Sequence, residues 1–76
     1  MKLTAMQIST LRLIRDGAVS EVRHGYGAWR IHGANPSTVG RLRSLGFCEK
    51  KRSGTDGDYQ FRLTEAGTSI LSEVDG

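Results

Sequence analysis

The sequence contains few of the residues that build disulfides and metal centres. Its 76 residues include one cysteine, Cys48, and two histidines, His24 and His32, which are well separated along the chain. Cys48 has no second cysteine for an internal disulfide, and no cluster of cysteines and histidines offers four ligands for zinc. The fold must therefore depend on its hydrophobic core, and we expect neither a metal nor another cofactor. We interpret Cys48 as a small buried hydrophobic residue rather than a reactive thiol.

Long apolar runs and catalytic motifs are missing as well. No stretch approaches the roughly 18 apolar residues of a membrane span, and no small-residue cleavage site follows the N-terminus. The sequence has no nucleophile beside a base, no pair of carboxylates and no loop typical of phosphate binding. We therefore expect a cytoplasmic protein that is not an enzyme, has no small-molecule ligand and does not bind a membrane.

The charged residues are unevenly distributed along the chain, although the formal net charge is only +3. Segment 20–52 has seven basic and two acidic side chains, whereas segment 53–76 has one basic and five acidic side chains. A basic middle segment favours a protein that presents one face to a polyanion such as nucleic acid. A solvated surface with no partner would have the same composition.

The N-terminal segment has the pattern of a capped amphipathic helix. Thr4 begins the capping box T-A-M-Q, in which Thr4 and Gln7 satisfy each other's backbone amides. Apolar residues then recur at helical spacing, and Gly17 is a typical residue after a helix end. The sequence predicts a helix at about 4–16.

The following segment, AVSEVRHGYGAWRIHG, favours extended structure over a second helix. Its glycines would each cost a helix about 1 kcal/mol relative to alanine, whereas Val22, Trp29 and Ile31 favour strands. We expect a strand or a loose hairpin at about 21–32. Trp29 is expected to anchor the core rather than to stack on bases.

A second helix is predicted at 36–45. Asn35 is a good N-cap, and Pro36 suits the first helical position because its missing N–H would be unpaired there. Val39, Leu42 and Leu45 share one face, and the outward positions are Ser37, Gly40, Arg41 and Ser44. Gly40 weakens the helix. Either a phosphate backbone or partner chain approaches it closely, or it packs against a neighbouring element.

The C-terminal part predicts a hairpin and a short helix. Two strand-like runs flank the turn sequence SGTDGD, which indicates a β-hairpin at 47–63. Tyr59 and Phe61 lie on its apolar face and are expected in the core. Thr64 can cap a helix at 65–74, whose apolar stripe either covers the first helix or forms the contact of a homodimer.

Two stretches resemble known winged helix-turn-helix domains. NPSTVGRLRSLGF, residues 35–47, is similar to the recognition helix of MarR-like and related regulators. EKKRSGTDGDYQFRLTEAG, residues 49–67, looks like a wing followed by the L-T-x-x-G turn into a further helix. The resemblance implies an α+β fold, with residues 1–76 forming one winged-helix domain. The chain departs from the family between Gly17 and Gly33, where a positioning helix is expected.

The resemblance also implies binding of double-stranded DNA by a small transcriptional regulator. Arg41 would read guanine, since a guanidinium can donate two hydrogen bonds to its O6 and N7 atoms, and the basic wing residues would follow the backbone. The implied DNA-binding residues are Ser37, Arg41, Arg43, Ser44, Lys50, Lys51 and Arg52. The alternative is a winged helix that binds a protein partner through this basic face, as an inhibitor or adaptor encoded by a phage or mobile element.

Overall fold

The computed structural model describes residues 2–25, 27–53 and 57–75, and within these ranges the chain forms a small α+β structure of three helices and four strands. In chain order these are α1 (Ala5–Arg15), β1 (Ser20–His24), β2 (Ala28–His32), α2 (Pro36–Ser44), β3 (Cys48–Ser53), β4 (Asp58–Leu63) and α3 (Glu65–Asp75). The α+β class is confirmed, and each predicted helix is present with ends within one residue of the prediction. Part of the predicted wing turn, residues 54–56, lies outside the described residues.

The helices begin at the predicted caps. The Thr4 hydroxyl accepts a hydrogen bond from the Gln7 amide at 3.1 Å, and the Thr4 amide donates to Gln7 Oε1 at 2.9 Å, which completes the capping box. Asn35 Oδ1 accepts from the amides of Ser37 and Thr38 at the start of α2. The cap side chains thereby satisfy one N-terminal amide of α1 and two of α2.

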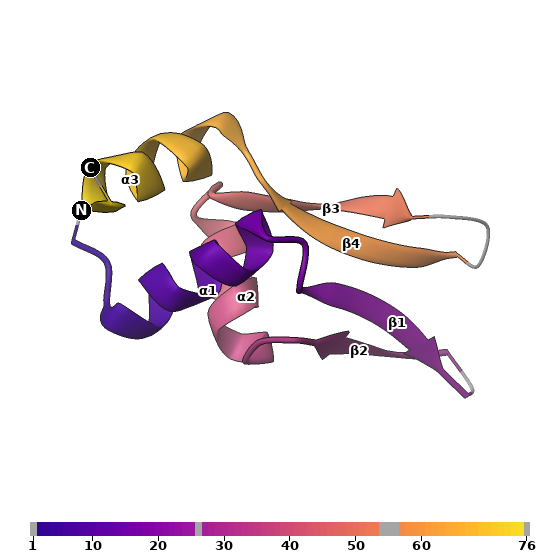
Figure 1. Ribbon diagram of the computed structural model, residues 1–76. Coiled ribbons are helices and arrows are strands. Elements are labelled where there is room, and N and C mark those ends of the chain that lie inside the picture. Colours follow the sequence, from indigo (N-terminus) through magenta and orange to yellow (C-terminus); the bar gives the residue numbers. More distant parts are fainter. Residues whose placement is uncertain (1, 26, 54–56, 76) are drawn as a thin grey trace.

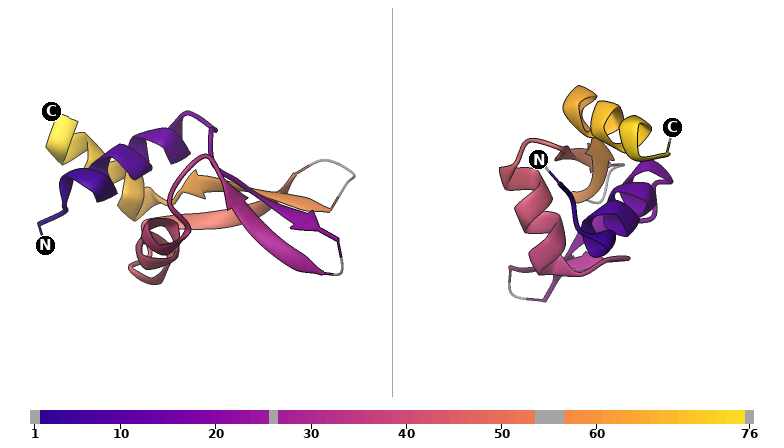
Figure 2. Two further views of the ribbon diagram at one scale, coloured as in Figure 1. Left: turned by 90° about the horizontal axis from the view of Figure 1, so that it is seen from below. Right: turned by 90° about the vertical axis from the view of Figure 1, so that its left-hand side faces the viewer.

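The strands form one antiparallel sheet in the order β2-β1-β4-β3. The segment predicted as a strand or loose hairpin is the hairpin β1–β2, and β3–β4 is the second hairpin. The hairpins join through β1 and β4, at the pairs Ser20↔Gln60 and Glu21↔Tyr59. Both hairpins extend away from the helices on the same side of the molecule (Figures 1 and 2).

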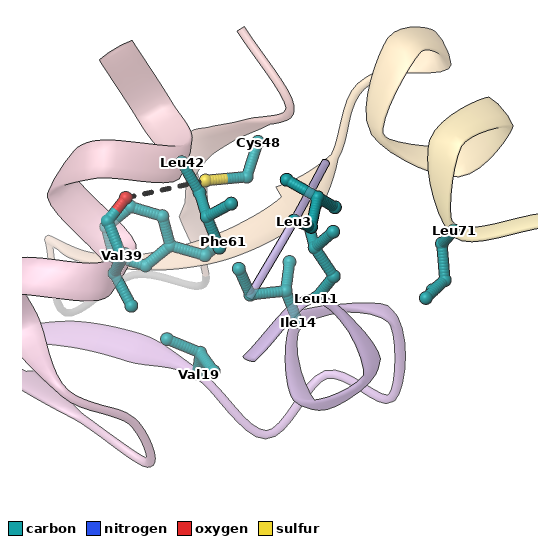
Figure 3. Close-up of a cluster of buried hydrophobic side chains, with 9 residues drawn as sticks. All are labelled: Leu3, Leu11, Ile14, Val19, Val39, Leu42, Cys48, Phe61 and Leu71. Atoms are coloured by element: carbon teal, nitrogen blue, oxygen red, sulfur yellow. Dashed lines mark hydrogen bonds between the residues drawn. The ribbon is translucent and has the colours of Figure 1, made fainter. Parts of the chain in front are cut away.

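The core lies where the three helices meet the base of the sheet (Figure 3). Phe61 of β4 is 2% exposed, and Val39 and Leu42 of α2 are fully buried beside it. The buried apolar residues are Leu3, Leu11, Ile14, Val19, Val39, Leu42, Cys48, Phe61 and Leu71. α3 lies against α1 and contributes Leu71, while Val74 at its end remains exposed. Burial of these side chains is the main source of stability in a chain with no disulfide.

The prediction that Trp29 anchors the core is wrong. Trp29 lies opposite Arg23, close to the turn of the β1–β2 hairpin, and is 43% exposed. Ile31, two residues nearer the base, shares its face of the sheet and packs partly buried against the core. The helices cover only the base of the sheet, so an apolar side chain near the hairpin tip stays in solvent.

Candidate nucleic-acid interface

The two faces of the sheet have different surroundings. Side chains alternate along each strand, so Cys48 and Phe61, which lie in the core with α2, define one face. We call this the helix face. Lys51 and Gln60, which are paired across β3 and β4 and are both exposed, define the opposite, outer face.

The wing cations are divided between these faces. Lys50 and Arg52 follow Cys48 at alternate positions and lie on the helix face, whereas Lys51 lies on the outer face. Three consecutive basic residues therefore do not form one cationic patch. A partner that contacts one face of this hairpin therefore meets either Lys51 or its two neighbours.

Lys50 is engaged within the protein. Its Nζ lies 2.9 Å from Glu21 Oε1 and 4.7 Å from the centroid of the Tyr59 ring. The Lys50 and Glu21 side chains are only 28% and 15% exposed. This ion pair connects β3 to β1 across β4, and it leaves the Lys50 charge compensated.

α2 presents small residues and one arginine to solvent. Val39 and Leu42 are buried, while Ser37, Gly40, Arg41 and Ser44 are all exposed. A Cβ added at Gly40 would have no atom within 4 Å, so the interpretation that Gly40 packs against a neighbouring element is wrong.

Arg41 and Arg43 leave different sides of α2, because two residues turn an α-helix through about 200°. Arg41 belongs to the exposed surface with Ser37 and Ser44.

Arg43 lies toward the base of β3, close enough for its charge to act on Cys48. Burial raises the pKa of the Cys48 thiol to about 11, and the charge of Arg43 opposes that rise. The Cys48 Sγ lies 3.9 Å from the carbonyl oxygen of Val39 (Figure 3). Cys48 is thus the buried, small apolar residue that the sequence predicts.

A shallow hollow of about 220 Å³ lies along the second hairpin and is lined by Lys51, Arg52, Ser53, Gln60 and Arg62. Gln60 Nε2 donates to the Gly17 carbonyl at 2.9 Å, and Arg62 pairs with Glu49 at 2.9 Å. Lys51 and Arg52 remain as the uncompensated cations of this surface.

Arg12 and Arg15 at the helical end form ion pairs, as do Lys50 and Arg62 of the second hairpin. Arg12 and Arg15 both bind Asp75, which joins α1 to α3. Apart from Lys2, the following basic residues form no ion pair within the described part of the chain: Arg23, Arg30, Arg41, Arg43, Lys51 and Arg52. Each of the six is exposed.

The structure brings together only part of the predicted site. Ser37, Arg41 and Ser44 share an exposed surface of α2, while Arg43 lies to one side and Lys50 is held by Glu21. Sequence reasoning did not include Arg23 and Arg30 in the site. Their exposure follows from the hairpin pairing of β1 and β2, and the glycines around the turn were the available signal.

Among residues 2–25, 27–53 and 57–75, no three His, Cys, Asp or Glu side chains are grouped so that they could hold a metal ion. None of the helices described there combines the length and apolarity of a membrane span. No protein-family model matches the chain, and comparisons with curated proteins and with solved structures also found no match.

Proposed function

We propose that this protein binds double-stranded DNA as a small winged-helix regulator. The observation that carries the proposal is the distribution of ion pairs: cations without an ion pair lie on α2 and both hairpins, whereas Arg12 and Arg15 at the helical end are paired with Asp75 and Asp16. Contacts with phosphates supply much of the affinity of DNA-binding proteins, and they require cations that are free to approach the backbone.

The chain order supports the winged-helix assignment. β1 follows α1, α2 precedes the hairpin β3–β4, and β1 pairs with β4, so this hairpin occupies the position of a wing. The hairpin β1–β2 replaces the positioning helix that precedes a recognition helix. Its free cations, Arg23 and Arg30, would take over the contacts of that helix with the DNA backbone.

In this proposal α2 enters the major groove. Its exposed surface has small side chains at Ser37, Gly40 and Ser44, and the bare backbone at Gly40 allows the wall of the groove to come close. Arg41 donates two hydrogen bonds to guanine. Arg43 contacts phosphates, and Arg52 and Lys51 contact phosphates from opposite faces of the wing. Lys50 stabilises the sheet through Glu21 and makes no DNA contact.

A second candidate is a protein partner with an acidic surface that the same cations would bind. The exposed Trp29 favours it, because tryptophan is enriched in protein interfaces. The chain would then act as an inhibitor or adaptor, and its affinity for duplex DNA would be negligible.

Measurement of the affinity for a labelled random-sequence duplex at several salt concentrations tests the proposal. We expect the logarithm of the association constant to fall linearly with the logarithm of the salt concentration. Lys51→Ala should make that slope shallower by about one unit, since one phosphate contact is lost. A specific site can be obtained by selection from random sequences. On that site Arg41→Ala should cost about 1 to 3 kcal/mol of binding free energy, whereas on random duplex the loss should be much smaller.

Arg12→Ala is the matched control, since it removes one positive charge from the pair with Asp75 at the helical end. Its salt slope should equal that of the wild type. No detectable duplex binding at low salt would contradict DNA binding and would favour the protein partner. Equal effects of Arg12→Ala and Lys51→Ala would show that binding depends only on the net charge of the protein.

A further inference from the structure

An aromatic pair lies exposed on the helix face of the sheet, beyond the reach of the helices. The rings of Trp29 on β2 and Tyr59 on β4 are 5.5 Å apart between centroids and inclined by 60°. Trp29 is 43% exposed and Tyr59 is partly buried. Tilted aromatic pairs stabilise each other's position, so Trp29 is held in place although one side of it faces solvent.

Free cations flank this pair. Arg23 is directly opposite Trp29 across β1 and β2, and Arg52 is directly opposite Tyr59 across β3 and β4. Side chains at such positions lie on one face with their Cβ atoms about 5 Å apart. Both arginines are exposed and form no ion pair with another described residue.

No uncompensated carboxylate interrupts this surface among the described residues. Glu21 lies on the same face, and its charge is balanced by Lys50. Asp58 precedes Tyr59 and therefore belongs to the outer face. Lys50, paired with Glu21, lies over the Tyr59 ring, so Trp29 is the open aromatic surface of the platform formed by Trp29, Tyr59, Arg23 and Arg52. The two arginines make its edges positive.

A hollow of about 430 Å³ adjoins the platform and leads to the start of α2. It is lined by Trp29, Ile31 and Pro36, together with Glu21, Arg30 and His32. A planar group placed against the exposed side of Trp29 would therefore lie next to the N-terminal end of α2, which the proposed function places in the DNA groove.

We propose that the platform binds an unpaired base of a nucleic acid, with the base stacked on Trp29 and its flanking phosphates bound by Arg23 and Arg52. This inference rests on the proposed function and narrows its target to a duplex that carries unpaired nucleotides. Aromatic rings bordered by cations are the usual means of binding unpaired bases. Within an intact duplex the bases stack on each other, so only the two terminal pairs offer a ring face to a surface indole.

The charge of the surface favours this occupant over an apolar segment of a protein. An apolar partner would remove water from the two free guanidinium groups at the edges and would offer them no hydrogen-bond acceptor in return. This desolvation would lower the affinity. Phosphates on either side of a stacked base would compensate both.

Trp29 is the single tryptophan of the chain, so its fluorescence reports on the platform alone. Three probes are titrated at low salt: a blunt duplex, the same duplex with a single-stranded tail of about eight thymidines, and the thymidine strand alone. We expect the tailed duplex to quench the emission strongly and to bind more tightly than the blunt duplex. The thymidine strand should also quench, and the blunt duplex should leave the emission nearly unchanged.

Trp29→Ala should weaken binding of the tailed duplex by about 5- to 100-fold and leave blunt-duplex affinity unchanged. Trp29→Phe should restore part of the loss, because a smaller aromatic ring still stacks. Met6→Ala is the control, since Met6 is an exposed apolar residue of α1 and should affect neither probe. Circular dichroism and urea unfolding verify that each variant is folded.

The outcomes separate this inference from the proposed function. Equal affinity of wild type for tailed and blunt duplexes, or no quenching by the tailed duplex, would overturn the base-binding platform while leaving duplex binding intact. Quenching by the thymidine strand without any binding of blunt duplex would support the platform and contradict the proposed duplex binding. If no probe binds, both proposals fail and a protein partner becomes the better interpretation.

Discussion

Two helical glycines have opposite surroundings. A Cβ added at Gly67, near the start of α3, would lie 1.9 Å from the carbonyl oxygen of Phe47, which is backbone and cannot move aside. A Cβ added at Gly40, in the middle of α2, would meet nothing within 4 Å. Gly67 is therefore required by packing. No contact within the described residues requires a glycine at position 40.

Alanine substitutions at these glycines should change the free energy of unfolding in opposite directions. Gly67→Ala forces α3 away from the Phe47 backbone, just before β3, with an expected loss of about 1 to 3 kcal/mol. Gly40→Ala should increase the free energy of unfolding by up to about 1 kcal/mol, because alanine favours the helix. Urea unfolding of both variants measures the difference.

The Gly40→Ala variant also examines the role of the bare helix backbone. If the groove of DNA approaches Gly40 closely, the more stable variant should bind duplex less tightly than wild type. A gain in stability with unchanged affinity would show that Gly40 is not required for contact with a partner.

At the level of elements, the two hairpins join over a short length of β1 and β4. β1 pairs with β4 at Ser20↔Gln60 and Glu21↔Tyr59, and the Glu21–Lys50 ion pair spans the junction from β1 to β3. Tyr59 lies beneath the Lys50 ammonium. The partial burial of this ion pair reduces screening by water, so it should stabilise the junction more than an exposed pair does.

A double-mutant cycle should detect this difference. The cycle compares Glu21→Gln, Lys50→Met and the double variant by urea unfolding. We expect a coupling energy of about 1 kcal/mol, which is at the upper end of the range for surface ion pairs. The Glu49–Arg62 pair is the control, because its side chains are 50% and 54% exposed. Its coupling should be nearer about 0.3 kcal/mol. Equal couplings would show that the Glu21–Lys50 pair has no special role at the junction.

The elements themselves were largely predictable because their signals are local. Thr4, Asn35 and Thr64 cap helices through side-chain bonds to amides two or three residues away, and such spacing is visible in the sequence. The glycines before and after β2 indicated a hairpin in place of a helix, and each adopts a positive φ. Turn and cap chemistry therefore specified where each element begins.

The surroundings of Trp29 and Lys50 were not predictable, since they depend on contacts distant in sequence. Alternation indicates that Trp29 and Ile31 share a face, but not that the helices cover only Ile31. Lys50 finds Glu21, 29 residues away, through the pairing of β1 with β4. The predicted site residues therefore stay a prediction, and the structure decides which of their cations form no ion pair.

At the level of the molecule, Asp75 fixes the last helix to the first. Arg12 Nε donates to Asp75 Oδ1 at 3.2 Å, and Arg15 Nη1 lies 3.4 Å from Oδ2. The hydrogen bond from Arg12 and the charges of both arginines hold the pKa of Asp75 below its ordinary value of 3.8. A depressed carboxyl pKa contributes stability above the pKa of the unfolded chain, and that contribution is lost as the pH falls through the folded value.

Asp75→Asn should therefore lower the free energy of unfolding at neutral pH and lose its effect in acid. The difference from wild type should be constant above about pH 5, begin to shrink as the pH falls toward 3.8, and vanish at lower pH. Urea unfolding at a series of pH values measures it. A difference that persists at the lowest pH would mean that Asp75 acts through packing and not through its charge.

The elongated shape of the chain arranges its charges along one axis. Its Cα extents are 41 × 21 × 17 Å, with α3 at one end and the two hairpins at the other (Figure 1). Residues 2–16 and 65–75, at the helical end, carry three basic and four acidic side chains, so this end is close to neutral. The free arginines lie on the hairpins at the other end, which gives the long axis a weak electric dipole. Near a polyanion this dipole would favour approaches in which the hairpin end of the molecule leads.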